Sequence, residues 1–198
     1  MSYRNVLDPK NTKVSVSSTA PGSSKKHLLN PSASDEGQPW SSNIPSSVHL
    51  TFDTPIQASH FALTFQGGFV STAISVWVAR SEDAEGGVGL GLMMGGKIYP
   101  EDRNKRQTFE IPFPPTGLSP TSEEPPSTTS TGPTITTEIT PAEANSGAVK
   151  AHPDGQGIIK KHNTDDELPY LTELKLEFEQ SSDHYGRVTL YSIEVLRE

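Results

Sequence analysis

The chain has 198 residues, a formal net charge of −8, no cysteine, 16 glycines and 17 prolines. Without cysteine, a disulfide framework, a thiolate zinc site and a cysteine nucleophile are excluded. The 24 acidic residues outnumber the 16 basic ones, which argues against generic attraction to nucleic acid or to an anionic membrane. Neither a secretory signal nor a membrane-spanning apolar run is visible, so we expect a soluble intracellular protein.

Most of the chain carries a two-residue hydrophobic period. We expect a flexible N-terminus over residues 1–11 and a weak first strand over residues 13–18. Further runs alternate apolar with polar residues, which is typical of half-buried strands. They contain Val48, Leu50 and Phe52; Phe61, Leu63 and Phe65; Ile74, Val76 and Val78; Phe109, Ile111 and Phe113; and Leu174, Leu176 and Phe178. Residues 188–196 are more continuously apolar, which predicts a central strand or one with a bulge.

Two segments interrupt this pattern. Residues 114–167 contain none of the 14 aromatic residues, and they hold eight prolines, eight acidic residues and three basic residues. Such a composition cannot bury enough apolar surface to offset the entropy of ordering, so we expect a disordered insert. Residues 81–96 are rich in glycine and predict a flexible hairpin loop. A phosphate-binding loop is disfavoured there, since no helix start and no Gly-Lys-Ser/Thr ending follows.

The sequence offers little support for catalysis. None of the six histidines has metal-ligand spacing with another, and no Gly-X-Ser-X-Gly motif is present. Glu101 and Asp102 are followed by Arg103, Lys105 and Arg106, which favours a solvated, ion-paired turn over a general acid or base. The same basic cluster is either ordinary surface or a contact for an acidic partner. We therefore expect a protein that is not an enzyme.

Three short motifs next to predicted strands combine aromatic, glycine and charged residues. They are Phe65-Gln66-Gly67-Gly68-Phe69, Tyr99-Pro100-Glu101-Asp102 and His184-Tyr185-Gly186-Arg187. Adjacent glycines permit positive φ or close backbone approach. Tyrosine and arginine are the residue types that dominate interaction hot spots. Each motif also has a purely structural interpretation as a tight turn.

In this order and spacing, these motifs resemble those of the nuclear receptor subfamily 2 group C member 2-associated protein family. The resemblance also includes Lys25-Lys26-His27-Leu28, Trp40-Ser41-Ser42, Asn104, Gln107-Thr108-Phe109 and Val188, and it spans residues 14–113 and 171–196. That family is a single discoidin-like (coagulation factor 5/8 C-type, galactose-binding-like) domain. The resemblance implies an eight-stranded jelly-roll β-sandwich. This agrees with the all-β domain that the strand pattern predicts for residues 12–113 and 168–198, whereas the disordered acidic insert departs from the family pattern.

The resemblance also implies a non-enzymatic adaptor in the nucleus or cytoplasm that binds a protein partner. The family points to a nuclear receptor or another nuclear complex, and to a role in transcription regulation. Direct binding to nucleic acid or a membrane is not expected. The alternative is a glycan or small-molecule binding module that uses loops at one end of the sandwich. The expected contact residues of the adaptor are Gln66, Gly67, Gly68, Phe69, Tyr99, Glu101, Asp102, Tyr185 and Arg187. Those of the glycan module are Trp40, Gln66 and Tyr99, with a core position beneath the loops as the alternative for Trp40.

Related domains hold a structural calcium ion in some cases. Here Asp35 and Glu36 in one loop and Glu194 in the last strand are the candidate ligands. Calcium prefers six to eight oxygen ligands, which these carboxylates and nearby carbonyls are able to supply. An ordinary acidic turn has the same appearance in a sequence. We therefore expect no cofactor, with a structural calcium ion as the alternative.

Overall fold

The computed structural model describes residues 2–30, 39–81, 90–114 and 168–198. In this part of the chain ten strands form, and they all pair antiparallel. Their bounds are β1 Arg4–Asn5, β2 Thr12–Val16, β3 Trp40–Asn43, β4 Ser46–Gln57, β5 His60–Phe65, β6 Ser71–Ser81, β7 Leu90–Ile98, β8 Arg106–Glu110, β9 Tyr170–Ser181 and β10 Arg187–Arg197. Among the described residues, no helix has the length and hydropathy needed to cross a membrane.

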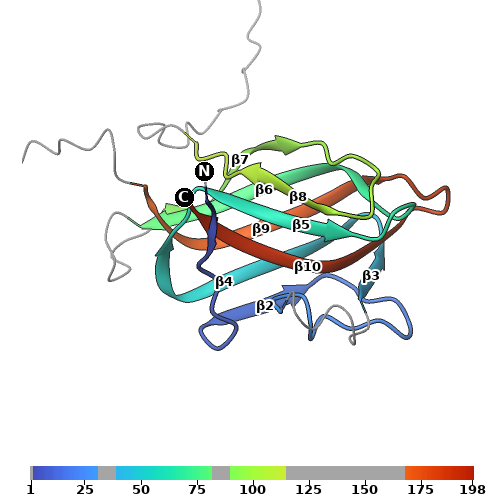
Figure 1. Cartoon of the computed structure of the whole chain (residues 1–198), viewed down its shortest axis with the longest axis horizontal. Coiled ribbons are helices and arrows are strands. Elements are labelled where there is room, and N and C mark those ends of the chain that lie inside the picture. The colour runs from blue at the N-terminus through green and yellow to red at the C-terminus, as the bar shows by residue number, and fades with distance from the viewer. Residues whose placement is uncertain (1, 31–38, 82–89, 115–167) are drawn as a thin grey trace, which may run out of the picture. The chain divides into compact units, whose positions relative to one another are not determined.

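The strands form two five-stranded sheets that pack face to face (Figure 1). In sheet A, β10 pairs with β1 and β3 on one side and with β5 on the other, and β8 follows β5. Sheet B has the order β2-β4-β9-β6-β7. The last two strands, β9 and β10, therefore occupy the interior of different sheets. The predicted all-β jelly-roll sandwich is confirmed, with ten strands in the described residues where the resemblance implied eight.

The core lies between the two sheets and is built from alternate residues of both. Phe178 of β9 is at its centre, with its ring centroid 5.6 Å from that of Trp40 and 6.4 Å from that of Phe65. Each large apolar side chain buried here contributes about 1.5–3 kcal/mol relative to an exposed one. The fully buried set includes Val48, Leu50, Phe61, Leu63, Ile74, Val76, Leu174, Leu176, Val188 and Leu190. Except for Val188 and Leu190, which belong to the continuous apolar run, these are residues of the alternating runs predicted from the sequence.

The alternating runs correspond to strands β4, β5, β6, β8 and β9, and the weak first run corresponds to β2. β10 is an interior strand, and its register with β5 shifts between Leu190 and Ser192, as the continuous apolar run predicted. Strand β8 is shorter than the alternating run of residues that predicted it. β8 stops at Glu110, although the alternation continues to Phe113. Pro112 and Pro114 lack the backbone N–H that would continue the ladder.

The prediction of a flexible loop over the glycine-rich residues 81–96 was wrong for the second half of that segment. Residues 90–96 were expected in a flexible loop, but they form most of β7, the outer strand of sheet B. An ideal Cβ at Gly95 would lie 1.8 Å from the carbonyl oxygen of Pro112. Glycine is therefore present here because the backbone after β8 approaches β7 closely, and not because the segment is a loop. Residues 82–89 lie outside the described residues.

The N-terminal residues also differ from the expectation of a flexible segment. Arg4 and Asn5 pair with Arg197 and Leu196 of β10, and Val6 donates its N–H to the Val195 carbonyl at 2.8 Å. Leu7 is buried in the core. Residues 4–7 thus pack against the sandwich because an apolar side chain and a free edge of β10 are available to them. The predicted insert over residues 114–167 lies outside the described residues, apart from Pro114.

Candidate functional site

Three of the predicted motifs lie in loops at the same end of the sandwich, opposite the N- and C-termini (Figure 1, right). These loops are residues 66–70 between β5 and β6, residues 99–105 between β7 and β8, and residues 182–186 between β9 and β10. We call this surface the loop end. The N–H of Gly68 donates to Asp102 Oδ1 at 2.8 Å, and the guanidinium carbon of Arg187 lies 4.4 Å from the Phe69 ring centroid. The structure therefore brings together motifs that are more than 100 residues apart.

The two adjacent glycines of the β5–β6 loop have different roles. Gly68 has a φ of 80°, in the left-handed region that favours glycine. An ideal Cβ at Gly67 would lie 3.3 Å from both the N and the Cβ of Asn104, so the β7–β8 loop packs closely against it. Phe69 and Gln66 are fixed by backbone hydrogen bonds to Thr189 of β10, at 2.9 and 3.0 Å. Both predicted roles of the glycines, positive φ and close approach, are present.

The β7–β8 loop presents Tyr99 to solvent. The Tyr99 residue is 69% exposed. Gln107 holds Glu101 through two hydrogen bonds, because its Oε1 accepts from the Glu101 N–H at 2.9 Å and its Nε2 donates to the Glu101 carbonyl at 2.8 Å. The Glu101 carboxylate pairs with Arg103 at 2.8 Å. As the charge pattern predicted, Glu101 and Asp102 lie in a surface turn that contains an ion pair.

The β9–β10 loop is a tight turn that projects Tyr185. Gly186 has a φ of 75° and donates its N–H to the Asp183 carbonyl at 3.0 Å. The Asp183 carboxylate also accepts from the Arg187 N–H at 3.0 Å. These bonds fix the turn while leaving the Tyr185 residue 86% exposed. The loop end therefore carries two exposed tyrosines on loops that are held by hydrogen bonds.

Trp40 was predicted as a contact residue, and this prediction was wrong. Its relative exposure is 0%, its ring packs on Phe178, and its Nε1 donates to the Ser18 carbonyl at 3.0 Å. The indole lies on the inward face of β3, where it fills the core beneath the loops. A partner that binds the loop end cannot reach it.

The calcium candidates do not form a site in the described residues. Glu194 accepts from Arg106 Nε at 2.7 Å and from Arg106 Nη2 at 3.1 Å. Asp35 and Glu36 lie outside the described residues. Within residues 2–30, 39–81, 90–114 and 168–198, no group of three or more histidine, aspartate or glutamate side chains is arranged to hold a metal ion.

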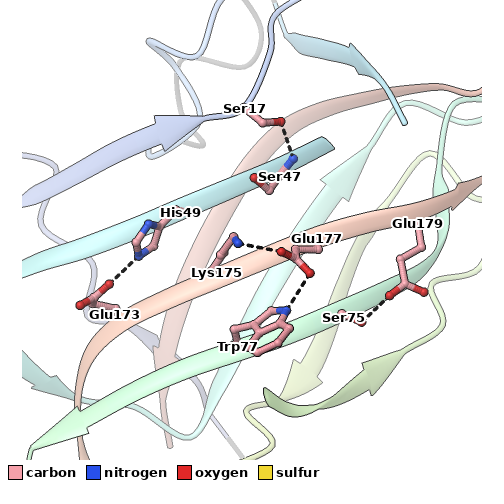
Figure 2. Close-up of polar contacts among 9 residues, drawn as sticks. All are labelled: Ser17, Ser47, His49, Ser75, Trp77, Glu173, Lys175, Glu177 and Glu179. Atoms are coloured by element: carbon pink, nitrogen blue, oxygen red, sulfur yellow. Dashed lines mark hydrogen bonds and ion pairs between the residues drawn. The ribbon is translucent and has the colours of Figure 1, made fainter. Parts of the chain in front are cut away.

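Sequence reasoning missed a second polar surface, on the outer face of sheet B (Figure 2). His49 of β4 pairs with Glu173 of β9 at 2.7 Å. Glu177 accepts from Lys175 Nζ at 2.7 Å and from Trp77 Nε1 at 2.9 Å. The signal was the two-residue spacing of Glu173, Lys175, Glu177 and Glu179 in β9. It did not identify the partners, because these come from strands up to 124 residues away.

Glu179 continues this surface toward β7. Its two oxygens accept from Ser75 Oγ and from Lys97 Nζ, both at 2.5 Å. The hydrogen bond from Lys97, followed by that from Ser75, holds the pKa of Glu179 below its ordinary value. The same hydrogen bond raises the pKa of Lys97. Both groups are therefore charged at neutral pH.

Comparison with known proteins identifies relatives over most of the chain. Nuclear receptor 2C2-associated protein from Mus musculus is 27% identical over 176 residues, which cover 88% of this chain and 79% of the relative. The Bos taurus protein is 26% identical over 87% of this chain. The Homo sapiens protein is 36% identical over 90 residues, 44% of this chain. The chain is similar to the nuclear receptor 2C2-associated proteins over most of its length. No protein-family model matches it.

Solved structures share the fold at low sequence identity. A family 32 carbohydrate-binding module from Clostridium perfringens NanJ, in complex with galactose, has a TM-score of 0.54 at 10% identity and covers 95% of each chain. An F5/8 type C domain from Bacteroides fragilis has a TM-score of 0.52 at 10% identity, covering 97% of this chain and 95% of that one. These likenesses confirm the predicted discoidin-like, galactose-binding-like fold.

Proposed function

We propose that the chain is a non-enzymatic protein-interaction adaptor that binds its partner through the loop end. The observation that supports the proposal is that Tyr99 and Tyr185 are exposed on two ordered loops. Asp102, in the loop of Tyr99, accepts a hydrogen bond from Gly68, and Arg187, which follows the loop of Tyr185, lies over the Phe69 ring. Exposed aromatic side chains on ordered loops provide a large contact area with little loss of conformational entropy on binding. Gln66, Gly67, Gly68, Phe69, Glu101, Asp102 and Arg187 complete the proposed surface.

The relatives supply the class of partner. They are named for association with nuclear receptor 2C2, so a nuclear receptor or a complex that contains one is the proposed partner. Such a protein would act in the nucleus or cytoplasm as a transcriptional co-regulator, by occupying a surface of the receptor and without chemistry of its own. Because the relatives' names refer to the receptor protein, the proposed partner is that protein and not its DNA.

The test compares a double tyrosine variant of the loop end with a control variant in which a tyrosine elsewhere is replaced. Tyr99→Ala combined with Tyr185→Ala removes both exposed rings from the loop end. Tyr3→Ala removes a partly exposed ring that contacts His60, at the other end of β5. We expect the double variant to bind purified nuclear receptor 2C2 at least tenfold more weakly, since one hot-spot contact contributes about 2 kcal/mol. The Tyr3 variant should bind as the unmodified chain does.

Binding is measured by calorimetry, and circular dichroism verifies that each variant is folded. A folded double variant with unchanged affinity would show that the loop end is not the interface. If the unmodified chain does not bind this receptor, the proposed partner is wrong. Quantitative affinity purification with the same three proteins then shows whether another partner depends on the two tyrosines.

A glycan or small-molecule function at the same loops is the second candidate. It is favoured by the likeness to a carbohydrate-binding module solved with galactose, and by Tyr99, whose exposed ring offers a flat surface on the β7–β8 loop. A rise in melting temperature on adding galactose, lost in Tyr99→Ala, would support it. Unchanged melting in the presence of galactose and of a glycan library would exclude it.

A further inference from the structure

The outer face of sheet B contains a shallow hollow of about 300 Å³. Its lining consists of the polar residues Ser17, Ser47, Glu177 and Glu179, of Pro45, and of the buried residues Ser46 and Phe178. Ser47 and Glu177 are paired in register, and both lie on the outer face because their neighbours Val48 and Leu176 are buried in the core. The volume is at the lower end of the range for small-molecule sites. Figure 2 shows Ser17, Ser47, Glu177 and Glu179 on this face.

The hollow offers hydrogen-bonding groups that are only partly used. Ser17 Oγ accepts from the Ser47 N–H at 2.8 Å, which leaves its own proton available to a ligand. The Ser47 hydroxyl makes no hydrogen bond within the described residues. Each oxygen of Glu177 and Glu179 accepts one bond, so each has a second lone pair available. Two hydroxyl donors therefore lie beside two carboxylate acceptors.

The two carboxylates of the lining are neutralised by lysines that lie outside it. Glu177 is paired with Lys175 at 2.7 Å, and Glu179 is paired with Lys97 at 2.5 Å. Because a lysine already neutralises each carboxylate, a cationic ligand would gain no net electrostatic attraction from this pair of carboxylates. An anionic ligand would meet two carboxylates directly. The lining therefore favours a neutral ligand that both donates and accepts hydrogen bonds.

The carboxylates are also held in place before any ligand binds. The Trp77 indole N–H fixes Glu177 at 2.9 Å, and the Ser75 hydroxyl fixes Glu179 at 2.5 Å. Since both supports come from the interior strand β6, the acceptors are attached to the sheet and not to a loop. Such preorganisation lowers the entropic cost of binding a small polar ligand.

We propose that this hollow is a binding site for a neutral hexose unit, separate from the loop end. The hexose hydroxyls would donate to Glu177 and Glu179 and accept from Ser17 and Ser47. The site does not depend on the adaptor function, because none of its lining residues belongs to the three loops. It would link the chain to a sugar or a glycan while a protein occupies the loop end.

The test is a titration of the full ¹⁵N-labelled chain followed by amide chemical shifts. The probes are D-glucose, its cationic analogue D-glucosamine at a pH where the amine is protonated, and its anionic analogue D-glucuronate. We expect D-glucose to cause saturable shifts at Ser47, Glu177 and Glu179, with Gly68 and Tyr185 unmoved. Both charged analogues should bind at least several-fold more weakly. Methyl α-D-glucoside, whose anomeric oxygen is capped as in a glycan, distinguishes a free sugar from a terminal glycan unit.

Two matched variants locate the binding. Ser47→Leu fills the hollow and should abolish the shifts. Thr51→Leu places the same side chain on the same face of β4, opposite Glu173 and outside the hollow, and should leave the shifts unchanged. The spectra also report whether each variant is folded. The proposal is overturned if D-glucose causes no saturable shift, if Ser47→Leu binds as well as Thr51→Leu, or if D-glucosamine binds more tightly. Shifts confined to Gly68 and Tyr185 would place sugar binding at the loop end instead.

Discussion

Gly186 is the residue on which the β9–β10 turn depends most. Its φ is 75°, and an ideal Cβ would lie 3.2 Å from Ile44 Cγ1. Gly186→Ala therefore combines left-handed backbone strain with crowding against a packed side chain. We expect it to lower the free energy of unfolding by about 2 kcal/mol, measured by urea denaturation.

Gly22 provides the matched control for this prediction. Its φ of 77° is nearly the same, but no atom lies within 4 Å of its ideal Cβ. Gly22→Ala should lower the free energy of unfolding by only about 1 kcal/mol. Equal losses in the two variants would show that the contact with Ile44 contributes nothing. The turn would then depend on backbone conformation alone.

The Glu179–Lys97 pair makes stability depend on pH in acid. Because the folded-state pKa of Glu179 is lowered, its contribution is present above the pKa of the unfolded chain and is lost as the pH falls through the folded-state pKa. The Lys97 pKa is raised, so its contribution is present at neutral pH and is lost only as the pH rises through its folded-state pKa. Solvent screening keeps both effects small, since these side chains are more than one-third exposed.

Glu179→Gln tests this dependence. The difference in the free energy of unfolding between the unmodified chain and the variant should be constant at neutral pH. It should shrink as the pH falls below about 4.5, the ordinary pKa of a glutamate. Urea denaturation at a series of pH values provides the measurement. A difference that stays constant down to the acid transition would show that the pair does not favour the ionised carboxyl.

Among the strands, β7 shows why a glycine-rich segment is not always a loop. A Cβ added at Gly95 would lie 1.8 Å from the Pro112 carbonyl oxygen, a backbone atom that cannot move away without shifting the chain after β8. Gly95→Ala should lower the free energy of unfolding by about 3 kcal/mol, measured by urea denaturation. Gly91→Ala, on the same strand with no neighbour within 4 Å, should change it by less than about 0.5 kcal/mol. Equal effects would mean that Pro112 does not constrain β7.

The strands that could be predicted are those whose pattern is local. β4, β5 and β9 bury one face against the core, and this is visible as alternation within each run. β3 has the sequence Trp-Ser-Ser-Asn and forms only because β10 lies beside it, so its neighbours in sequence do not indicate it. β7 was not predicted because its glycines suggest a loop, although they allow the close approach of Pro112. A contact between distant segments leaves no periodic signal.

The site residues show the same difference between local and non-local sequence signals. The loop motifs were predictable, since Tyr99, Tyr185 and the paired glycines Gly67 and Gly68 stand out in their local sequence. Trp40 was assigned to the site wrongly, because an aromatic next to a loop has the same sequence signature whether it faces solvent or the core. The carboxylates of β9 were visible as residues, but their partners on β4, β6 and β7 are set by strand register, which one sequence does not reveal.

For the molecule as a whole, we propose that residues 114–167 are an insert that the sandwich does not need. Replacing residues 115–167 by a Gly/Ser linker of about twelve residues shortens the connection roughly fourfold. Loop closure then becomes easier by about 1.2 kcal/mol, at about 0.6 kcal/mol for each halving. We expect an unchanged amide spectrum for the strands and a slightly higher melting temperature. A variant that fails to fold would show that the segment contributes structure.

The positions of β9 and β10 have a consequence for biosynthesis. β9 joins β4 to β6, and β10 joins β5 to both β1 and β3, yet these two strands are made after the other eight described strands. Until they leave the ribosome, each sheet consists of separate groups of strands whose hydrogen-bonding edges have no partner. The sandwich therefore cannot assemble progressively from its N-terminus during translation. Until synthesis reaches residue 197, the newly made chain therefore exposes apolar strands and unpaired edges, and a chain in this condition is prone to aggregate.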